Sequence, residues 1–196
     1  ASSATSLGAS IRGKVTQPPG SGPYRPFGPF DISVAKTVIV SGSALGGMIS
    51  VPLQPDGTFE IPKVPQGSYL LRVPGLFGAS ATATITDRDI TNLEIRAPFV
   101  TQASGRIVVE DQQPLPSGLT LALNSPNREA SSSVSSNGSF TATFIEGDNQ
   151  IGVNRLPLGY AIKSISYAGL DIGKGPLKID QKPAEGDIVI TLSVTA

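Results

Sequence analysis

Short runs of alternating or β-branched residues, each ended by Gly, Pro, Asn or Asp, follow one another along the whole chain. The 22 glycines and 17 prolines are spread throughout rather than clustered. Strands that recur roughly every 8–12 residues between turn signals are typical of an all-β sandwich or barrel. No window keeps apolar residues at helical spacing between caps, so we expect almost no helix. We expect strands at residues 10–16, 37–41, 47–53, 58–61, 68–73, 79–86, 91–97, 101–109, 118–123, 130–135, 139–144, 149–153, 160–168 and 187–194.

Two sequence motifs of the first half return in the second half. Gly13-Lys14-Val15 matches Gly105-Arg106-Ile107, and Asp56-Gly57-Thr58-Phe59 matches Asn137-Gly138-Ser139-Phe140. Asp-Gly and Asn-Gly supply the positive φ that a tight hairpin turn needs. The aromatic residue that follows each turn is then well placed to enter the core. The repeat therefore predicts the same strand-and-turn frame in both halves.

Each half ends on an alternating strand, at residues 93–95 and 188–192. The boundary between the halves therefore falls near residues 97–100, with almost no linker. We expect two β-sandwich domains, at residues 7–98 and 99–196, each long enough to bury a core of its own.

These motifs resemble the bacterial carboxypeptidase-regulatory-like domain, whose pattern runs from a Gly-Lys/Arg-Val strand through Asp-Gly-x-Phe to Pro-x-Gly-x-Tyr. The first half carries all three pieces, the last of them as Pro65-Gln66-Gly67-Ser68-Tyr69. The second half keeps the first two and then departs, with Asn149 near the Tyr position and Glu146 in place of Pro. Residues 158–165 are also similar to the second member of such tandem pairs.

The resemblance implies a fold and a class of function. Each half is expected to form a seven-stranded, antiparallel Greek-key sandwich of the transthyretin-like (prealbumin-like), Ig-like type. The family serves as an accessory module beside peptidases, outer-membrane receptors and other surface proteins. No catalytic residues are known for it, so the resemblance transfers none to this chain.

The chain contains no His and no Cys. Catalytic relays and zinc sites that use histidine are therefore excluded, as are thiol nucleophiles, thiolate metal sites and disulfides. Lys+Arg and Asp+Glu number 15 each, so no net charge attracts nucleic acid or an anionic membrane. No paired-carboxylate or Ser-x-x-Lys arrangement stands out, and no apolar run approaches the ~20 residues that span a bilayer. We expect a protein that is not an enzyme, binds no cofactor, metal or nucleic acid, and does not insert into a membrane.

The most unusual stretch is residues 17–31, which is rich in Pro and Gly. The first-strand and turn glycines are 44 residues apart in the first half and 33 in the second, so this loop adds 11 residues. Long loops are often functional. Tyr24, Phe27 and Phe30, beside Arg25, can stack on a sugar or grip a Pro-rich peptide. The alternative is that the two phenylalanines fold back to cap an open end of the sandwich.

An isopeptide bond is a second possible feature of the first half. Collagen-adhesin B-type domains, which share a related sandwich, join a lysine to an asparagine with the help of a buried acid. Lys14, Asn92 and Glu60 are the residues that could do so here. However, Lys14 alternates with the apolar Ile11 and Val15 and should therefore face water.

A calcium site is a third possibility, at the turn that follows residues 79–86. Asp87 and Asp89, together with Thr86 and Thr91, could offer oxygen ligands to Ca²⁺. Calcium sites usually need several converging carboxylates or carbonyls. Two carboxylates separated by Arg88 favour a solvated turn instead.

We expect a structural and interaction module of a secreted or cell-envelope bacterial protein, which spaces or docks other domains. It would lie outside the cell, in the periplasm or on the outer surface. Residues 1–10 lack the basic start and apolar core of a signal peptide, so any export signal has been removed or lies elsewhere. The expected partners are other domains of the parent protein or cell-surface proteins. The alternative is a carbohydrate- or peptide-binding module that uses residues 24–30.

Overall fold

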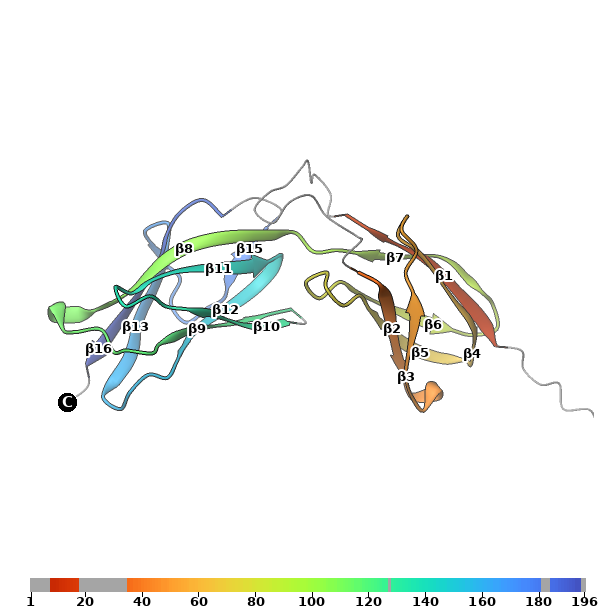
Figure 1. Cartoon of the computed structure of the whole chain (residues 1–196), viewed down its shortest axis with the longest axis horizontal. Coiled ribbons are helices and arrows are strands. Elements are labelled where there is room, and N and C mark those ends of the chain that lie inside the picture. The colour runs from red at the N-terminus through yellow and green to blue at the C-terminus, as the bar shows by residue number, and fades with distance from the viewer. Residues whose placement is uncertain (1–7, 18–34, 127, 181–183, 195–196) are drawn as a thin grey trace, which may run out of the picture. The chain divides into compact units, whose positions relative to one another are not determined.

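The chain folds into two compact units, Ala1–Pro98 and Phe99–Ala196, each made of β-strands (Figure 1). Helical structure within the described residues is limited to two 3-10 turns, Ser43–Leu45 (η2) and Glu110–Gln112 (η3). The predicted all-β fold with almost no helix is therefore confirmed. This computed structural model describes residues 8–17, 35–126, 128–180 and 184–194.

The first unit contains two sheets. A three-stranded sheet has the order β4-β1-β7, and a four-stranded sheet has the order β3-β2-β5-β6. Neighbouring strands are antiparallel except β1 and β7, which are parallel. Inward-facing residues of both sheets form one buried apolar cluster, so the unit is a sandwich. The strands are β1 (Ala9–Thr16), β2 (Thr37–Gly42), β3 (Gly47–Pro52), β4 (Thr58–Val64), β5 (Gly67–Arg72), β6 (Ser80–Ile85) and β7 (Ile90–Arg96).

The second unit repeats this frame and adds a hairpin. Its sheets have the orders β11-β8-β16-β13-β14 and β10-β9-β12-β15. Strands β8 to β12, β15 and β16 take the places of β1 to β7, and β8 and β16 are again parallel. The inserted strands β13 and β14 extend the sheet beside β16. The strands are β8 (Val100–Val109), β9 (Thr120–Ser125), β10 (Arg128–Ser133), β11 (Ser139–Ile145), β12 (Gly147–Asn154), β13 (Tyr160–Tyr167), β14 (Leu170–Asp171), β15 (Leu177–Ile179) and β16 (Ile188–Val194).

Each of the fourteen predicted strands is present, with ends that differ by at most three residues from the prediction. Strands β14 and β15 were not predicted. They are two and three residues long, which is too short to show a period-two pattern.

A phenylalanine ring lies across a glycine at the centre of the first unit. Gly13 on β1 is paired with Phe59 on β4, whose side chain is buried. A Cβ atom on Gly13 would lie 2.5 Å from Cζ of Phe59 and 2.3 Å from the carbonyl oxygen of Leu93 on β7. Only glycine therefore lets the ring and the third strand approach β1 this closely.

The second unit has the same arrangement. Gly105 on β8 is paired with Phe140 on β11, which is also buried. A Cβ atom on Gly105 would lie 2.4 Å from Cζ of Phe140 and 2.4 Å from the carbonyl oxygen of Ile188 on β16. We call the two arrangements the glycine–phenylalanine contacts. They explain why the sequence motifs recur together.

The turns before β4 and β11 hold each phenylalanine in register. Gly57 and Gly138 both have a φ of 86°, the left-handed region that glycine favours. Their carbonyl oxygens accept hydrogen bonds of 2.8 Å from the backbone N–H groups of Val15 and Ile107. Each turn is thereby tied to the first strand of its unit.

Tyr69 closes the start of β5 in the first unit. Its ring is buried and its hydroxyl donates a 2.6 Å hydrogen bond to the carbonyl of Pro65, four residues earlier. This bond satisfies the one polar group of an otherwise apolar side chain.

Asn149 takes the place of Tyr69 in the second unit. Its side chain is fully buried, and its Nδ2 donates to the carbonyls of Ile145 (2.8 Å) and Gly147 (2.9 Å). Its Oδ1 accepts from the N–H of Ile145 (3.2 Å) and from the hydroxyl of Ser125 (2.7 Å). The bond to the residue four positions earlier is common to both units. Ile145, and not Glu146 as the motif suggested, therefore stands at the position of the motif's proline.

We expect Gly105→Ala to lower the free energy of unfolding by about 2–3 kcal/mol, because the new methyl group overlaps a backbone carbonyl that cannot move aside. The control is Gly47→Ala on β3, where an added Cβ meets no atom within 4 Å. Urea titration of the whole chain by circular dichroism measures both. Equal stability of the two variants would contradict the proposed role of the glycine–phenylalanine contacts.

We also expect Asn149→Ala to destabilise the second unit by about 2–4 kcal/mol, because it leaves buried carbonyl groups without donors. The neighbouring Gln150 is exposed and donates one 2.9 Å bond to the Lys174 carbonyl, so Gln150→Ala should change stability by less than about 1 kcal/mol. Thermal unfolding of the two variants gives the comparison. A similar small effect for both would show that Asn149 is replaceable.

Candidate functional site

The aromatic loop that the sequence singles out lies outside the described residues. Tyr24, Arg25, Phe27 and Phe30 all fall between Gln17 and Ala35, the nearest residues that the structure describes. Their role as ligand-binding residues stays a prediction.

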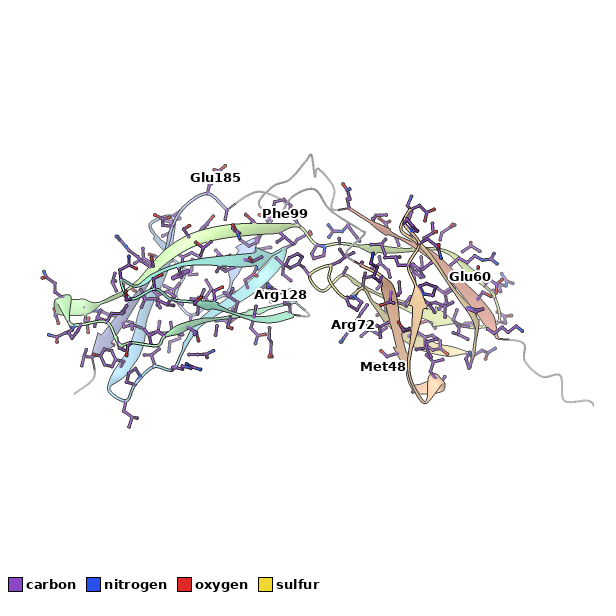
Figure 2. The ribbon with its side chains drawn as sticks, in the orientation of Figure 1. Met48, Glu60, Arg72, Phe99, Arg128 and Glu185 are labelled. Carbon is purple, nitrogen blue, oxygen red and sulfur yellow. The ribbon has the colours of Figure 1, made fainter. Side chains whose placement is uncertain are left out.

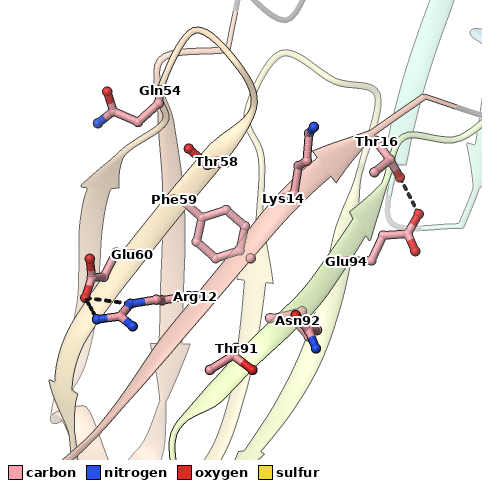
Figure 3. Close-up of a pocket in the computed structure, with 12 residues that line it drawn as sticks. Arg12, Lys14, Thr16, Gln54, Thr58, Phe59, Glu60, Thr91, Asn92 and Glu94 are labelled. Atoms are coloured by element: carbon pink, nitrogen blue, oxygen red, sulfur yellow. Dashed lines mark hydrogen bonds and ion pairs between the residues drawn. The ribbon is translucent and has the colours of Figure 1, made fainter.

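The structure describes a different concave feature, a groove of about 620 Å³ on the outer face of the sheet β4-β1-β7 (Figure 3). Sequence reasoning did not predict it, although the alternation of the strands did place several of its residues on the outside. The groove is lined by Arg12, Gly13, Lys14, Thr16, Gln54, Thr58, Phe59, Glu60, Thr91, Asn92, Leu93 and Glu94.

The strand register sets the shape of the groove. Gly13 is paired with Phe59 on one side and with Leu93 on the other, so these three residues form a row across the sheet. The phenylalanine points into the core, and the row therefore presents mainly backbone to the outside. The long side chains of the neighbouring rows stand on either side of it.

One wall of the groove is built around an ion pair. Nε and Nη2 of Arg12 both lie 3.0 Å from Oε1 of Glu60, and the two residues are paired across β1 and β4. Both side chains are about half exposed. An exposed ion pair of this kind contributes about 0–1 kcal/mol to stability. The ion pair therefore orients two charged groups but adds little to the stability of the fold.

The other wall contains Lys14, which is paired with Thr58 on β4 and with Glu94 on β7. Lys14 is exposed and makes no hydrogen bond or ion pair with the described residues. Glu94 instead accepts a 2.5 Å hydrogen bond from the Thr16 hydroxyl. The Lys14 ammonium group is thus available to a polar ligand, beside hydroxyl and carboxylate groups that already hydrogen-bond to protein partners.

Thr58 is held in place by the turn below it. Oδ1 of Asp56 accepts hydrogen bonds from the Thr58 hydroxyl (2.7 Å) and backbone N–H (3.0 Å). The hydroxyl bond, followed by the backbone bond and then the nearby charge of Lys14, lowers the pKa of Asp56 below its usual 3.8. In the second unit, Asn137 accepts the same two bonds from Ser139, at 2.7 and 3.0 Å.

The isopeptide bond considered from the sequence does not fit this geometry. Ile11 and Val15 are buried and Lys14 is exposed, as the alternation predicted. Figure 3 shows the Lys14 side chain extending away from Asn92. Glu60, the proposed acid, is occupied by Arg12.

The acidic turn considered for calcium is occupied by protein contacts. Oδ1 of Asp89 accepts a 2.7 Å hydrogen bond from the backbone N–H of Ser10, and Oδ1 of Asp87 accepts one of 3.2 Å from the Thr86 hydroxyl. No group of three or more Asp, Glu, His or Cys residues is placed to hold a metal in the part of the chain that the structure describes. The turn is explained by its role in attaching the start of β1.

These observations limit what the groove can do. Its charged groups are exposed to water, and its carboxylates are engaged by Arg12 and Thr16. The arrangement can make reversible contacts with a polar surface.

No known family model matches the sequence, and no curated protein matches it. Solved structures do match the fold. A minor pilin of Streptococcus agalactiae, GBS52, is 10% identical with a TM-score of 0.53, over 96% of this chain and 97% of that one. A DUF3823 family protein from Parabacteroides merdae is 16% identical with a TM-score of 0.33, over 70% and 80%. The shaft pilin SpaA from Lactobacillus rhamnosus is 8% identical with a TM-score of 0.30, over 93% and 97%.

At these identities the comparison concerns the fold alone. The chain shares a β-sandwich architecture with the minor pilin along almost its whole length. Within the residues that the structure describes, no helix combines the length and apolar character needed to cross a bilayer.

We expect the pKa of Asp56 to lie below that of an aspartate in the unfolded chain. Its hydrogen bonds therefore contribute stability above the unfolded pKa, and this contribution is lost as the pH falls through the folded value. Asp56→Asn should keep the turn, as Asn137 does, but remove this pH dependence. Comparing urea unfolding of the two proteins at neutral and acidic pH measures the difference.

Thr58→Val is the control for the cause of this shift, because it removes the hydroxyl donor at nearly constant volume. An NMR titration of the Asp56 carboxyl carbon should show the pKa moving back toward its usual value in this variant. An unchanged pKa would assign the shift to a different cause.

Proposed function

We propose that the chain is a non-catalytic structural and interaction module of a secreted or cell-envelope bacterial protein, and that it spaces or docks other domains. The observation that carries this proposal is the duplication of one strand frame. Each unit has a glycine–phenylalanine contact and a turn that is hydrogen-bonded to the first strand. Each also has a buried side chain that donates a hydrogen bond to the backbone carbonyl four residues earlier.

The interior of both units supports this reading. Thr101 and Asn149 are buried polar residues, and both are hydrogen-bonded. Among the described residues, no buried side-chain nitrogen or oxygen lacks a partner. Buried polar groups without a partner often mark functional sites. An interior without them favours a spacer.

The sequence motifs favour a family. We propose that both units are of the carboxypeptidase-regulatory-like type, at residues 7–98 and 99–196. Their seven-strand frame agrees with the sandwich that this family is expected to form. The proposed partners are other domains of the parent protein or other cell-surface proteins. A balanced charge of 15 acidic and 15 basic residues argues against nucleic acid as a partner.

A second candidate function is the binding of a carbohydrate or a peptide by the loop at residues 17–31. The composition of the loop favours it, because it holds three of the 11 aromatic residues of the chain. Tyr24, Phe27 and Phe30 would supply the stacking surface, and Arg25 would supply a cation.

Glycan and peptide arrays distinguish the two functions. We expect the whole chain to bind no array member with a dissociation constant below about 100 μM, because a spacer needs no ligand site. The opposite result is specific binding that is lost in Tyr24→Ala with Phe27→Ala and kept in a variant of the groove, Lys14→Met. It would overturn the spacer function and establish the loop as a binding site.

A further inference from the structure

The hairpin β2–β3 of the first unit is free of charge. Residues 37–55 contain no Asp, Glu, Lys or Arg, in a chain that has 15 acidic and 15 basic residues. β3 lies at the edge of the sheet β3-β2-β5-β6. An edge strand presents unpaired backbone N–H and C=O groups, and natural proteins commonly protect such edges with charged side chains. β3 has no such protection.

β3 also exposes large apolar side chains. Met48 is 75% exposed and Ile49 is 37% exposed. Being consecutive in a strand, they lie on opposite faces of it. Gly47 and Ser50 are exposed as well, and the burial of the strand begins only at Val51. Figure 2 shows Met48 on this strand, in the sheet opposite the one that carries Glu60.

The second unit allows each position of this sheet to be compared with its counterpart. Leu70 and Gln150 are at equivalent positions of the two units. Each directly follows the buried residue, Tyr69 or Asn149, that donates a hydrogen bond to the carbonyl four residues earlier. Ser41 lies opposite Leu70 on β2, and Asn124 lies opposite Gln150 on β9. Ser41 and Asn124 are therefore equivalent.

The comparison extends to the two edge strands. Met48 on β3 lies opposite Ser41, and Glu129 on β10 lies opposite Asn124. The exposed methionine of the first unit thus corresponds to a glutamate in the second. The unit-2 edge is protected by Arg128, Glu129 and a run of serines, whereas the unit-1 edge is apolar at the same place.

We propose that β3 is a self-association edge, at which two copies of the chain pair their β3 strands antiparallel about a twofold axis. The pairing would join two four-stranded sheets into one of eight strands. It satisfies the free backbone groups of both edges and covers Met48 and Ile49 of both copies. A twofold arrangement needs only one self-complementary patch.

Charge argues for a second β3 as the occupant. Neither strand carries a charge, so the pairing brings no like charges together and buries no unpaired ion. Most other edge strands of the chain would bring charged residues against β3. These charged residues are Glu60 and Lys63 on β4, Glu94 and Arg96 on β7, Arg128 and Glu129 on β10, Asp171 on β14 and Lys178 on β15. The edge strands β6 and β11 are uncharged, but neither exposes a large apolar side chain that could pack on Met48 and Ile49.

The expected association is weak. A six-residue strand buries far less than the ~1,200 Å² of a stable interface, so we expect a dissociation constant of about 10⁻⁴ M. Sedimentation velocity from about 10 μM to about 1 mM should show a monomer–dimer equilibrium. Met48→Glu, which installs the residue of the second unit, should weaken dimerisation at least about tenfold. The control is Ser131→Glu on β10, which adds the same charge to the other edge and should leave dimerisation unchanged.

A cross-link tests the geometry of the pair. The chain has no cysteine, so a single Ile49→Cys substitution introduces its only thiol. Mild oxidation should join two copies of this variant much faster than two copies of the Ala130→Cys control on β10. Circular dichroism and urea unfolding should show both Met48→Glu and Ile49→Cys folded, since both positions are exposed.

Three results would overturn the proposal. They are a wild-type chain that stays monomeric at about 1 mM, a Met48→Glu variant that dimerises like the wild type, and equal cross-linking of the two cysteine variants. The strand pairing goes beyond the proposed function, and an experiment can contradict either one while the other stands. Ligand binding on the arrays would overturn the spacer function and leave the strand pairing intact, whereas a monomeric chain would do the reverse.

Discussion

The structure of each unit depends on a missing side chain. At Gly13 and Gly105 the first strand has no Cβ, and a phenylalanine ring from one neighbour and a backbone carbonyl from the other occupy the space. This contact fixes the register of three strands at once. The first strand of each unit has an antiparallel partner on one side and a parallel partner on the other. The turn, the core and the outer groove all follow from that register.

The outer faces of the first unit differ in chemistry although they share a core. The face of β4-β1-β7 carries paired charges around a shallow groove, and its energetic contribution is small because those charges remain in water. The hairpin β2–β3 carries none over 19 residues, from Thr37 to Pro55. A surface of mixed charge keeps a protein soluble, whereas an uncharged edge invites contact. One small sandwich thus has a charged outer face on one sheet and an uncharged hairpin at the edge of the other.

Local patterns predicted the strands well because alternation is a property of the sequence itself. Ile11 and Val15 face the core and Lys14 faces water, as their spacing requires. The patterns could not predict which strands pair with each other. The strand at residues 160–168 was expected, but its attachment beside β16 depends on partners distant in sequence. The groove combines residues of three strands, so it exists only once their register is known. The burial of Asn149 had one sequence signal, its place near the tyrosine of the motif, and residue type argued against it because polar residues are usually exposed.

The different closures at Tyr69 and Asn149 have a consequence for a chain that must fold two similar units from one sequence. Neighbouring repeats of like sequence are prone to exchange strands and become trapped in misfolded forms. If β5 entered the second unit in place of β12, a phenol ring would meet a site shaped for a compact amide, and the Ser125 hydroxyl would lose its acceptor. The two closures therefore oppose an exchange of β5 and β12 between the units.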